Sequence, residues 1–108
     1  MDKENLVHEL KKRIVDNINV ESIIMFGSVA QNKDSSDSDI DILVIWNEEG
    51  NLSNRERRIK LRRIIGYFDC PLDVLTYTQK EVDMALLEDK SFISQVIREG
   101  KVIYGRLH

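Results

Sequence analysis

Three aspartates and a Gly-Ser pair are the residues of this chain whose types and spacing suggest chemistry. Asp39 and Asp41 lie two positions apart at the start of a hydrophobic run, DIDILVIW. Residues two apart in a β-strand point to the same face of the sheet, so the two carboxylates are expected side by side. Adjacent carboxylates repel each other and are costly to desolvate, which favours a cation between them. Oxygen ligands of this kind suit Mg²⁺, which keeps several waters and is commonly shared with substrate phosphates.

A third carboxylate and a phosphate-binding turn extend this prediction. Asp73 begins the later hydrophobic segment LDVLTY. If the two strands are neighbours, three carboxylates meet at one edge of the sheet, enough to hold two ions about 3.5–4 Å apart. Gly27 and Ser28 follow a β-branched segment, and a tight turn there offers backbone N–H groups and a hydroxyl to a phosphate.

A calcium-binding loop is a rival interpretation of the same acidic residues. Asp37, Asp39, Asp41 and Glu48 fall at positions 1, 3, 5 and 12 of an EF-hand loop. The sixth position of such a loop is glycine, and here it is Ile42, inside an apolar strand. This interpretation fails, and Asp37 is best regarded as a loop residue.

Helices and strands alternate along the chain to position these residues. Helices are expected over 2–18, 53–67, 78–88 and 91–99, and strands over 20–26, 39–46, 72–77 and, as a small last strand, 101–104. Capping boxes, Ser53 with Glu56 and Thr78 with Glu81, mark two of the helix starts. In the last helix, Phe92 and Val96 are expected on the packed face. This order predicts an α/β or α+β fold, a sheet with helices packed on it.

Length and composition indicate a single globular domain over 1–108. Hydrophobic residues make up 42% and charged residues 32% of the chain, which argues against disorder. A net charge of −3 does not favour a nucleic-acid partner. The longest apolar run, Ile42 to Trp46, is too short to cross a membrane, and the charged N-terminus has no signal-peptide core. With Cys70 as the single cysteine, we expect a cytoplasmic protein.

Positive charge is concentrated in one segment of this acidic chain. Six basic residues fall within 55–63, with Glu56 as the one acid: Arg55, Arg57, Arg58, Lys60, Arg62 and Arg63. We interpret the segment as a solvent-facing helix surface. A docking surface for an acidic partner or an RNA is the alternative.

The spacing of the Gly-Ser pair and the aspartates resembles a known signature. Gly27-Ser28, ten residues, then Asp39-Ile-Asp41 is similar to the motif of the minimal nucleotidyltransferases (MNT) of the DNA polymerase β superfamily. The segments ILVIW, LDVLT and IREGKVIYG also resemble small members, so the likeness covers roughly 6–105. It implies a mixed sheet backed by helices. It further implies that Asp39, Asp41 and Asp73 form the catalytic, metal-binding site, with two Mg²⁺ ions expected, and that Gly27 and Ser28 contact the β- and γ-phosphates of a nucleoside triphosphate.

The resemblance also implies a reaction and a partner. The reaction is transfer of a nucleoside monophosphate to a hydroxyl with release of pyrophosphate, and ATP is the expected donor. Free-standing members this short resemble the MNT partner of HEPN–MNT toxin–antitoxin modules, in which the MNT protein can adenylylate its HEPN partner. We therefore expect a protein adenylyltransferase that acts as the antitoxin of a HEPN-type toxin.

A departure from the family pattern supports a second interpretation. Many members carry an arginine shortly after the Gly-Ser pair, where this chain has Gln31, and Lys33 offers only a point charge in its place. The alternative is a non-catalytic, nucleotide-binding adaptor that neutralises its partner by forming a complex. A third candidate, a subunit that modifies a small molecule such as an aminoglycoside, ranks lower because so short a chain has no evident acceptor pocket. The sequence leaves the oligomeric state open.

Overall fold

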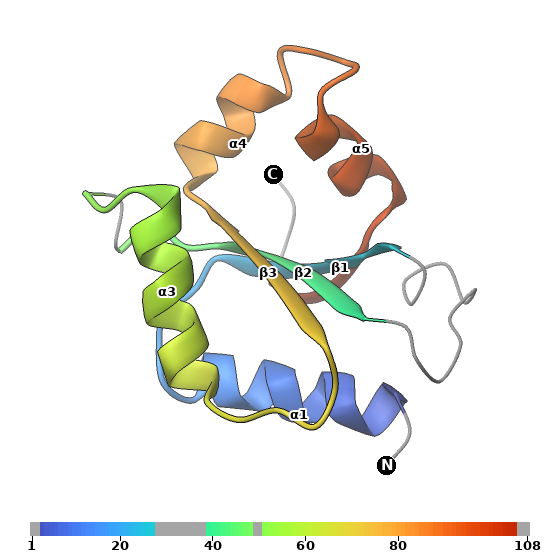
Figure 1. The fold of residues 1–108 in the computed structure, drawn as a ribbon. Helices are drawn as coiled ribbons and strands as arrows, with labels where there is room; N and C mark the ends of the chain where they lie inside the picture. Colours follow the sequence, from blue (N-terminus) through green and yellow to red (C-terminus); the bar gives the residue numbers. More distant parts are fainter. Residues whose placement is uncertain (1–2, 28–38, 49–50, 106–108) are drawn as a thin grey trace.

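A mixed four-stranded sheet forms the centre of the molecule (Figure 1). The computed structural model describes residues 3–27, 39–48 and 51–105. The elements follow the order α1 (Lys3–Val15), β1 (Ser22–Phe26), β2 (Ile40–Ile45), α3 (Asn54–Ile65), β3 (Leu72–Tyr77), α4 (Gln79–Ala85), α5 (Phe92–Glu99) and β4 (Lys101–Gly105). The strand order is β3-β2-β1-β4. Because β1 is antiparallel to β2 and β4 while β2 is parallel to β3, the expected mixed α+β architecture is confirmed.

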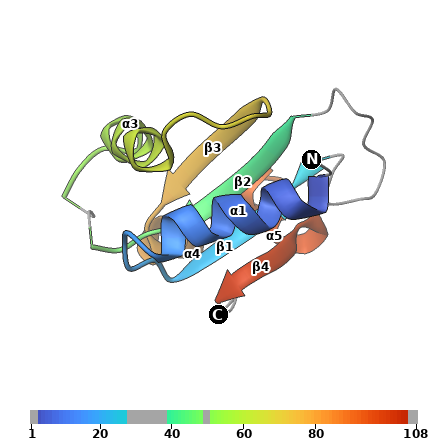
Figure 2. The ribbon, with the colours of Figure 1, turned by 90° about the horizontal axis from the view of Figure 1, so that it is seen from below.

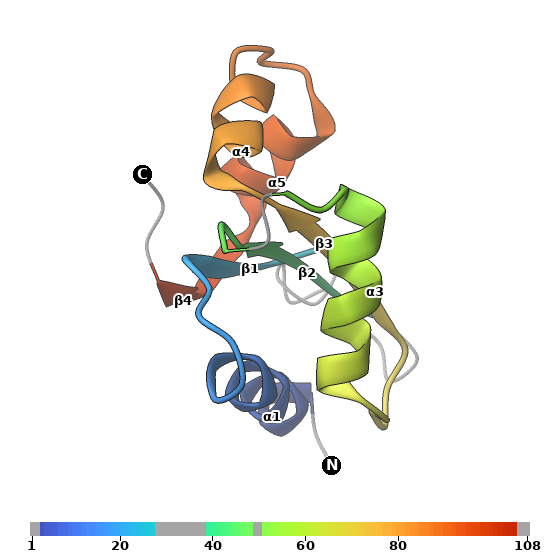
Figure 3. The ribbon, with the colours of Figure 1, turned by 90° about the vertical axis from the view of Figure 1, so that its left-hand side faces the viewer.

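Helices cover both faces of this sheet. Figure 3 shows α1 and α3 on one face and α4 and α5 on the other. Figure 2, seen from below, shows α1 in front of the strands. Successive residues of a strand point to opposite faces, so β2 contributes to two apolar cores. Ile40, Ile42 and Val44 pack in the core shared with α1. Leu43 and Ile45 pack in the core shared with α4 and α5.

Side-chain caps set the helix boundaries. Both predicted capping boxes are present, Ser53 with Glu56 and Thr78 with Glu81. The first helix ends at Val15 rather than at residue 18, and the amide of Asn17 donates a hydrogen bond to the Arg13 carbonyl oxygen at 2.6 Å just beyond that end. The third expected helix ends earlier than predicted as well, where the Ser91 hydroxyl donates to the Ala85 carbonyl oxygen at 3.0 Å. In both cases a side chain satisfies a carbonyl group that the helix leaves open.

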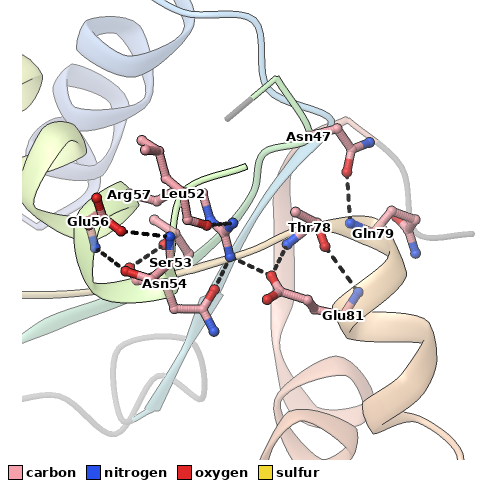
Figure 4. A network of polar contacts seen from close by, with 10 residues as sticks. Asn47, Leu52, Ser53, Asn54, Glu56, Arg57, Thr78, Gln79 and Glu81 are labelled. Carbon is pink, nitrogen blue, oxygen red and sulfur yellow. Dashed lines mark hydrogen bonds and ion pairs between the residues drawn. The ribbon is translucent and has the colours of Figure 1, made fainter. Parts of the chain in front are cut away.

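One arginine of the basic segment is buried rather than solvent-facing (Figure 4). Arg57 is 1% exposed and donates to the Leu52 carbonyl oxygen at 2.6 Å and to the side chain of Asn54. It also pairs with Glu81 at 2.5 Å, whose carboxylate caps α4 by accepting from the backbone of Thr78. The network therefore ties the start of α3 to the start of α4. The other basic residues of the segment, Arg55, Arg58, Lys60, Arg62 and Arg63, are exposed as predicted.

No helix within the described part of the chain is long and apolar enough to span a bilayer.

Candidate functional site

Two of the predicted aspartates lie beside each other on neighbouring strands. Asp41 and Asp73 are register partners in the parallel β2–β3 pair, so the strands are adjacent as the three-carboxylate prediction required. On the other side of Asp41, its partner in the antiparallel β1–β2 pair is Phe26. Alternation along each strand places these three side chains on the sheet face that carries α4 and α5. The sheet thus presents a row, Phe26–Asp41–Asp73, at one end of that face.

Asp41 has the most perturbed electrostatic environment in this row. Its side chain is half-buried, whereas Asp39 and Asp73 are exposed. Burial raises the pKa of Asp41 above its usual range, and the negative charges of Asp73 and Asp39 raise the pKa further. Asp39 and Asp73 are therefore both close enough to act on the Asp41 carboxylate electrostatically. Such mutual repulsion is what a bound cation would offset.

Gly27 brings the backbone directly against this carboxylate. Its φ is +77°, a left-handed conformation that side-chain-bearing residues rarely adopt. A Cβ atom at this position would lie 2.3 Å from Oδ2 of Asp41, closer than any real contact. The backbone conformation therefore favours glycine here, and a side chain at this position would have to displace the Asp41 carboxylate. Of the predicted phosphate-binding pair, Gly27 adjoins the carboxylate row, while Ser28 lies outside the described residues, as do Gln31, Lys33 and Asp37.

A family comparison accounts for this arrangement. Residues 8–108 match the family model described as polymerase beta, nucleotidyltransferase. The chain belongs to this nucleotidyltransferase family. The resemblance inferred from the Gly-Ser and Asp-x-Asp spacing is thereby confirmed. No curated protein sequence matches the chain significantly.

Solved structures support the same nucleotidyltransferase fold. One is a protein from Sulfolobus solfataricus assigned as a nucleotidyltransferase, with a TM-score of 0.66 and 20% identity over 94% of this chain and 79% of that one. Another is a crystal structure described as a toxin–antitoxin with AMP-PNP, with a TM-score of 0.58 and 26% identity over 97% of this chain and 75% of that one. The first likeness concerns the fold alone.

The donor atoms of the site fit a hard divalent cation bound together with other ligands. Within 3–27, 39–48 and 51–105, no three or more histidine, cysteine, aspartate or glutamate side chains are gathered closely enough to enclose a metal ion. The carboxylates of Asp41 and its neighbours interact, but they supply only part of a coordination shell. Mg²⁺ typically takes one or two protein carboxylates and completes its shell with water and phosphate oxygens. The site is therefore chemically suited to Mg²⁺ that arrives with a phosphate ligand.

The sequence-based prediction missed residues of α5 that line a cavity with Phe26 and Gly27. Phe92 was expected on the packed face, but it is 56% exposed. Ile93 and Val96 form the buried face of α5 instead, and Phe92 lies at its edge. Gln95 lies one turn further along and lines, with Phe92, a cavity that reaches Gly27. An aromatic residue at the first position of a short helix gives no sequence signal that distinguishes an exposed ring from a packed one.

Proposed function

We propose that this chain is a Mg²⁺-dependent nucleotidyltransferase that moves AMP from ATP to a hydroxyl of a protein partner. We propose further that the partner is a HEPN-type toxin, that the chain acts as its antitoxin, and that it does so in the cytoplasm. The observation that carries the proposal is the placement of Asp41. Its half-buried carboxylate lies between Asp73 on one side and Gly27 on the other, in a chain of the nucleotidyltransferase family.

The structural comparison supports the partner class. The related toxin–antitoxin structure contains AMP-PNP, an ATP analogue, and its fold extends over nearly all of this chain. A similar protein in such a system favours an antitoxin role here.

The residues of the proposed site have distinct chemical roles. Asp41 and Asp39 hold Mg²⁺, and the turn at Gly27 and Ser28 binds the β- and γ-phosphates. Asp73 accepts the proton of the acceptor hydroxyl, and the hydroxyl oxygen forms a bond to the α-phosphorus. The bond from that phosphorus to the bridging oxygen of pyrophosphate breaks, and pyrophosphate leaves. When bound, Mg²⁺ neutralises the phosphate charge and favours ionisation of the hydroxyl.

Transfer of a radioactive label tests the proposal. The purified chain is incubated with Mg²⁺, α-labelled ATP and the product of the neighbouring gene as the candidate partner, in parallel with Asp41→Asn. Glu21→Gln is the matched control, because it removes one negative charge from an exposed position at the opposite end of β1. We expect label on the partner with the unaltered chain and with Glu21→Gln, and none with Asp41→Asn.

The adaptor alternative makes the opposite prediction for the same variants. The replacement of the family's arginine by Gln31 favours a chain that neutralises its partner by complex formation alone. Two results together would refute the transferase and establish the adaptor. The first is a stable complex that carries no label, and the second is neutralisation of the partner by the Asp41→Asn variant.

A further inference from the structure

A cavity of about 180 Å³ opens between the end of β1 and helix α5. Figure 1 shows α5 above the end of β1, on the sheet face that carries the carboxylate row. The cavity is lined by Phe26, Gly27, Phe92, Gln95, Val96 and Glu99. The sequence-based prediction assigned none of the four α5 residues a role in binding.

The cavity borders the proposed nucleotide site. It includes Gly27, whose backbone lies against Asp41, and Phe26, which is the register partner of Asp41. Side chains of such partners lie about 4.5–5.5 Å apart at their Cβ atoms. A nucleotide whose α-phosphate lies at Asp41 therefore has its sugar and base within reach of the cavity.

The walls combine aromatic surface with a polar edge. The rings of Phe26 and Phe92 meet edge to face, with centroids 5.8 Å apart and an interplanar angle of 82°. Since Phe92 remains 56% exposed, it offers apolar ring surface to a ligand. Gln95 donates an amide N–H to Glu99 at 3.3 Å, so the amide and carboxylate oxygens of this pair are hydrogen-bond acceptors at the rim. A nucleobase has the matching character, with apolar faces for stacking and a polar edge for hydrogen bonds.

Strand order distinguishes the donor side of the site from the acceptor side. In the order β3-β2-β1, Asp73 lies on one side of Asp41, and Phe26 with Gly27 lies on the other. If Asp73 receives the proton of the acceptor hydroxyl, the acceptor approaches from the β3 side. The cavity beside β1 is then on the side of the nucleotide donor.

We propose that the cavity between β1 and α5 binds the base of the nucleoside triphosphate, with Phe92 as its stacking surface. This inference rests on the proposed nucleotidyltransferase function. It assigns Phe92 to ligand binding and Gln95 to the hydrogen-bonding edge of the base.

Calorimetric titration with two ligands tests the assignment. ATP carries a base, whereas inorganic tripolyphosphate offers phosphates alone, and both are titrated with Mg²⁺ into the unaltered chain and three variants. Phe92→Ala removes the stacking surface, and Phe92→Trp retains an aromatic ring. Leu87→Ala is the matched control, because Leu87 is an exposed apolar residue of the α4–α5 connection that does not line the cavity.

We expect Phe92→Ala to weaken ATP binding about 5- to 150-fold, the range of base–aromatic stacking, and to leave tripolyphosphate binding unchanged. Phe92→Trp retains ATP binding, and Leu87→Ala binds both ligands like the unaltered chain. Thermal unfolding followed by circular dichroism verifies that each variant is folded.

Three outcomes would overturn the inference. If Phe92→Ala leaves ATP binding unchanged, or weakens both ligands equally, the base does not occupy the cavity. If the Phe92→Ala variant retains ATP binding but loses transfer of label to the partner, the cavity binds the acceptor instead of the base. If the unaltered chain binds neither ligand with Mg²⁺, the proposed function itself fails, and this result is distinct from a failure confined to Phe92.

Discussion

Replacement of Asp41 by asparagine should make the ligand-free chain more stable while it abolishes the proposed activity. An asparagine side chain has nearly the same shape as that of aspartate but no charge, so packing at the start of β2 is retained. The half-buried carboxylate is destabilised in the folded protein by desolvation, by Asp73 and by Asp39. The substitution removes all three unfavourable contributions together.

The spacing of the strands sets the size of the effect. Asp41 and Asp73 are partners on adjacent strands, which lie about 4.8 Å apart. At this separation two unit charges in water repel by about 0.9 kcal/mol. The value for water applies because Asp73 is exposed. With the smaller repulsion by Asp39 and the desolvation of the carboxylate added, we expect the free energy of unfolding to increase by about 1 kcal/mol or more. An increase of about 1 kcal/mol corresponds to a rise in melting temperature of about 4–8 °C.

The pH dependence follows from the direction of the pKa shift. Because folding raises the pKa of Asp41, ionisation of this group costs free energy in the folded state. The cost is absent below the unfolded pKa of about 3.9, and it grows as the pH rises through the folded pKa. The stability difference between Asp41→Asn and the unaltered chain should therefore be near zero at pH 3 and largest at neutral pH.

Thermal unfolding of the metal-free proteins between pH 3 and pH 7.5 measures this difference. Glu21→Gln, the matched loss of one exposed negative charge, should show no comparable pH-dependent gain. Added Mg²⁺ and ATP should stabilise the unaltered chain but not Asp41→Asn. A metal-free Asp41→Asn protein that is less stable than the unaltered chain at neutral pH would refute the electrostatic reasoning.

Two further predictions concern the supports of the site. Gly27→Ala should abolish ATP binding in the same titration, because the new Cβ displaces the Asp41 carboxylate. Gly66 has a similar φ of 70° with no atom within 4 Å, so Gly66→Ala should lose about 1–3 kcal/mol of stability and retain ATP binding. Equal ATP binding by both variants would contradict this prediction. Arg57→Met should lower the free energy of unfolding in urea by about 2 kcal/mol, because the Leu52 carbonyl and the side chains of Asn54 and Glu81 lose their charged donor. Arg58→Met, at the exposed neighbouring position, should change it by less than about 0.5 kcal/mol.

Local signals allowed the elements to be predicted, and tertiary contacts explain what was missed. Side-chain caps such as Ser53 with Glu56 act within a few residues, so they are visible in the sequence. Arg57 lies four residues before Leu61, on the buried face of α3, so its position was visible in the helix spacing. Its burial as a charged group depends on Glu81, which is far along the chain. Helix periodicity identifies a face, but the partner element decides which residues that face buries.

The same distinction between local signals and tertiary contacts applies to the candidate site. The same-face placement of Asp39 and Asp41 follows from strand geometry alone, and it was predictable. The pairing of Asp41 with Asp73 depended on strand order, which the sequence left as a condition. The close approach of Gly27 to Asp41 depends on the antiparallel register of β1 and β2, because residue 26 is paired with residue 41. Ser28 and Gln31 lie outside the described residues, so their predicted roles stay predictions.

Asp41 places a carboxylate at a position of β2 where an apolar side chain would give a more stable fold. On the face toward α4 and α5, Leu43 and Ile45 are fully buried, and Asp41 is the next residue along the same row. A leucine at this position would extend the apolar core and add stability, so the carboxylate is retained at a cost to the ligand-free fold. A cation with its phosphate ligand would relieve that cost. The stability and ligand-binding measurements on Asp41→Asn therefore both test the claim that this carboxylate is retained for a ligand. If the site bound no ligand, the variant would gain stability, but it would lose no stabilisation by Mg²⁺ and ATP.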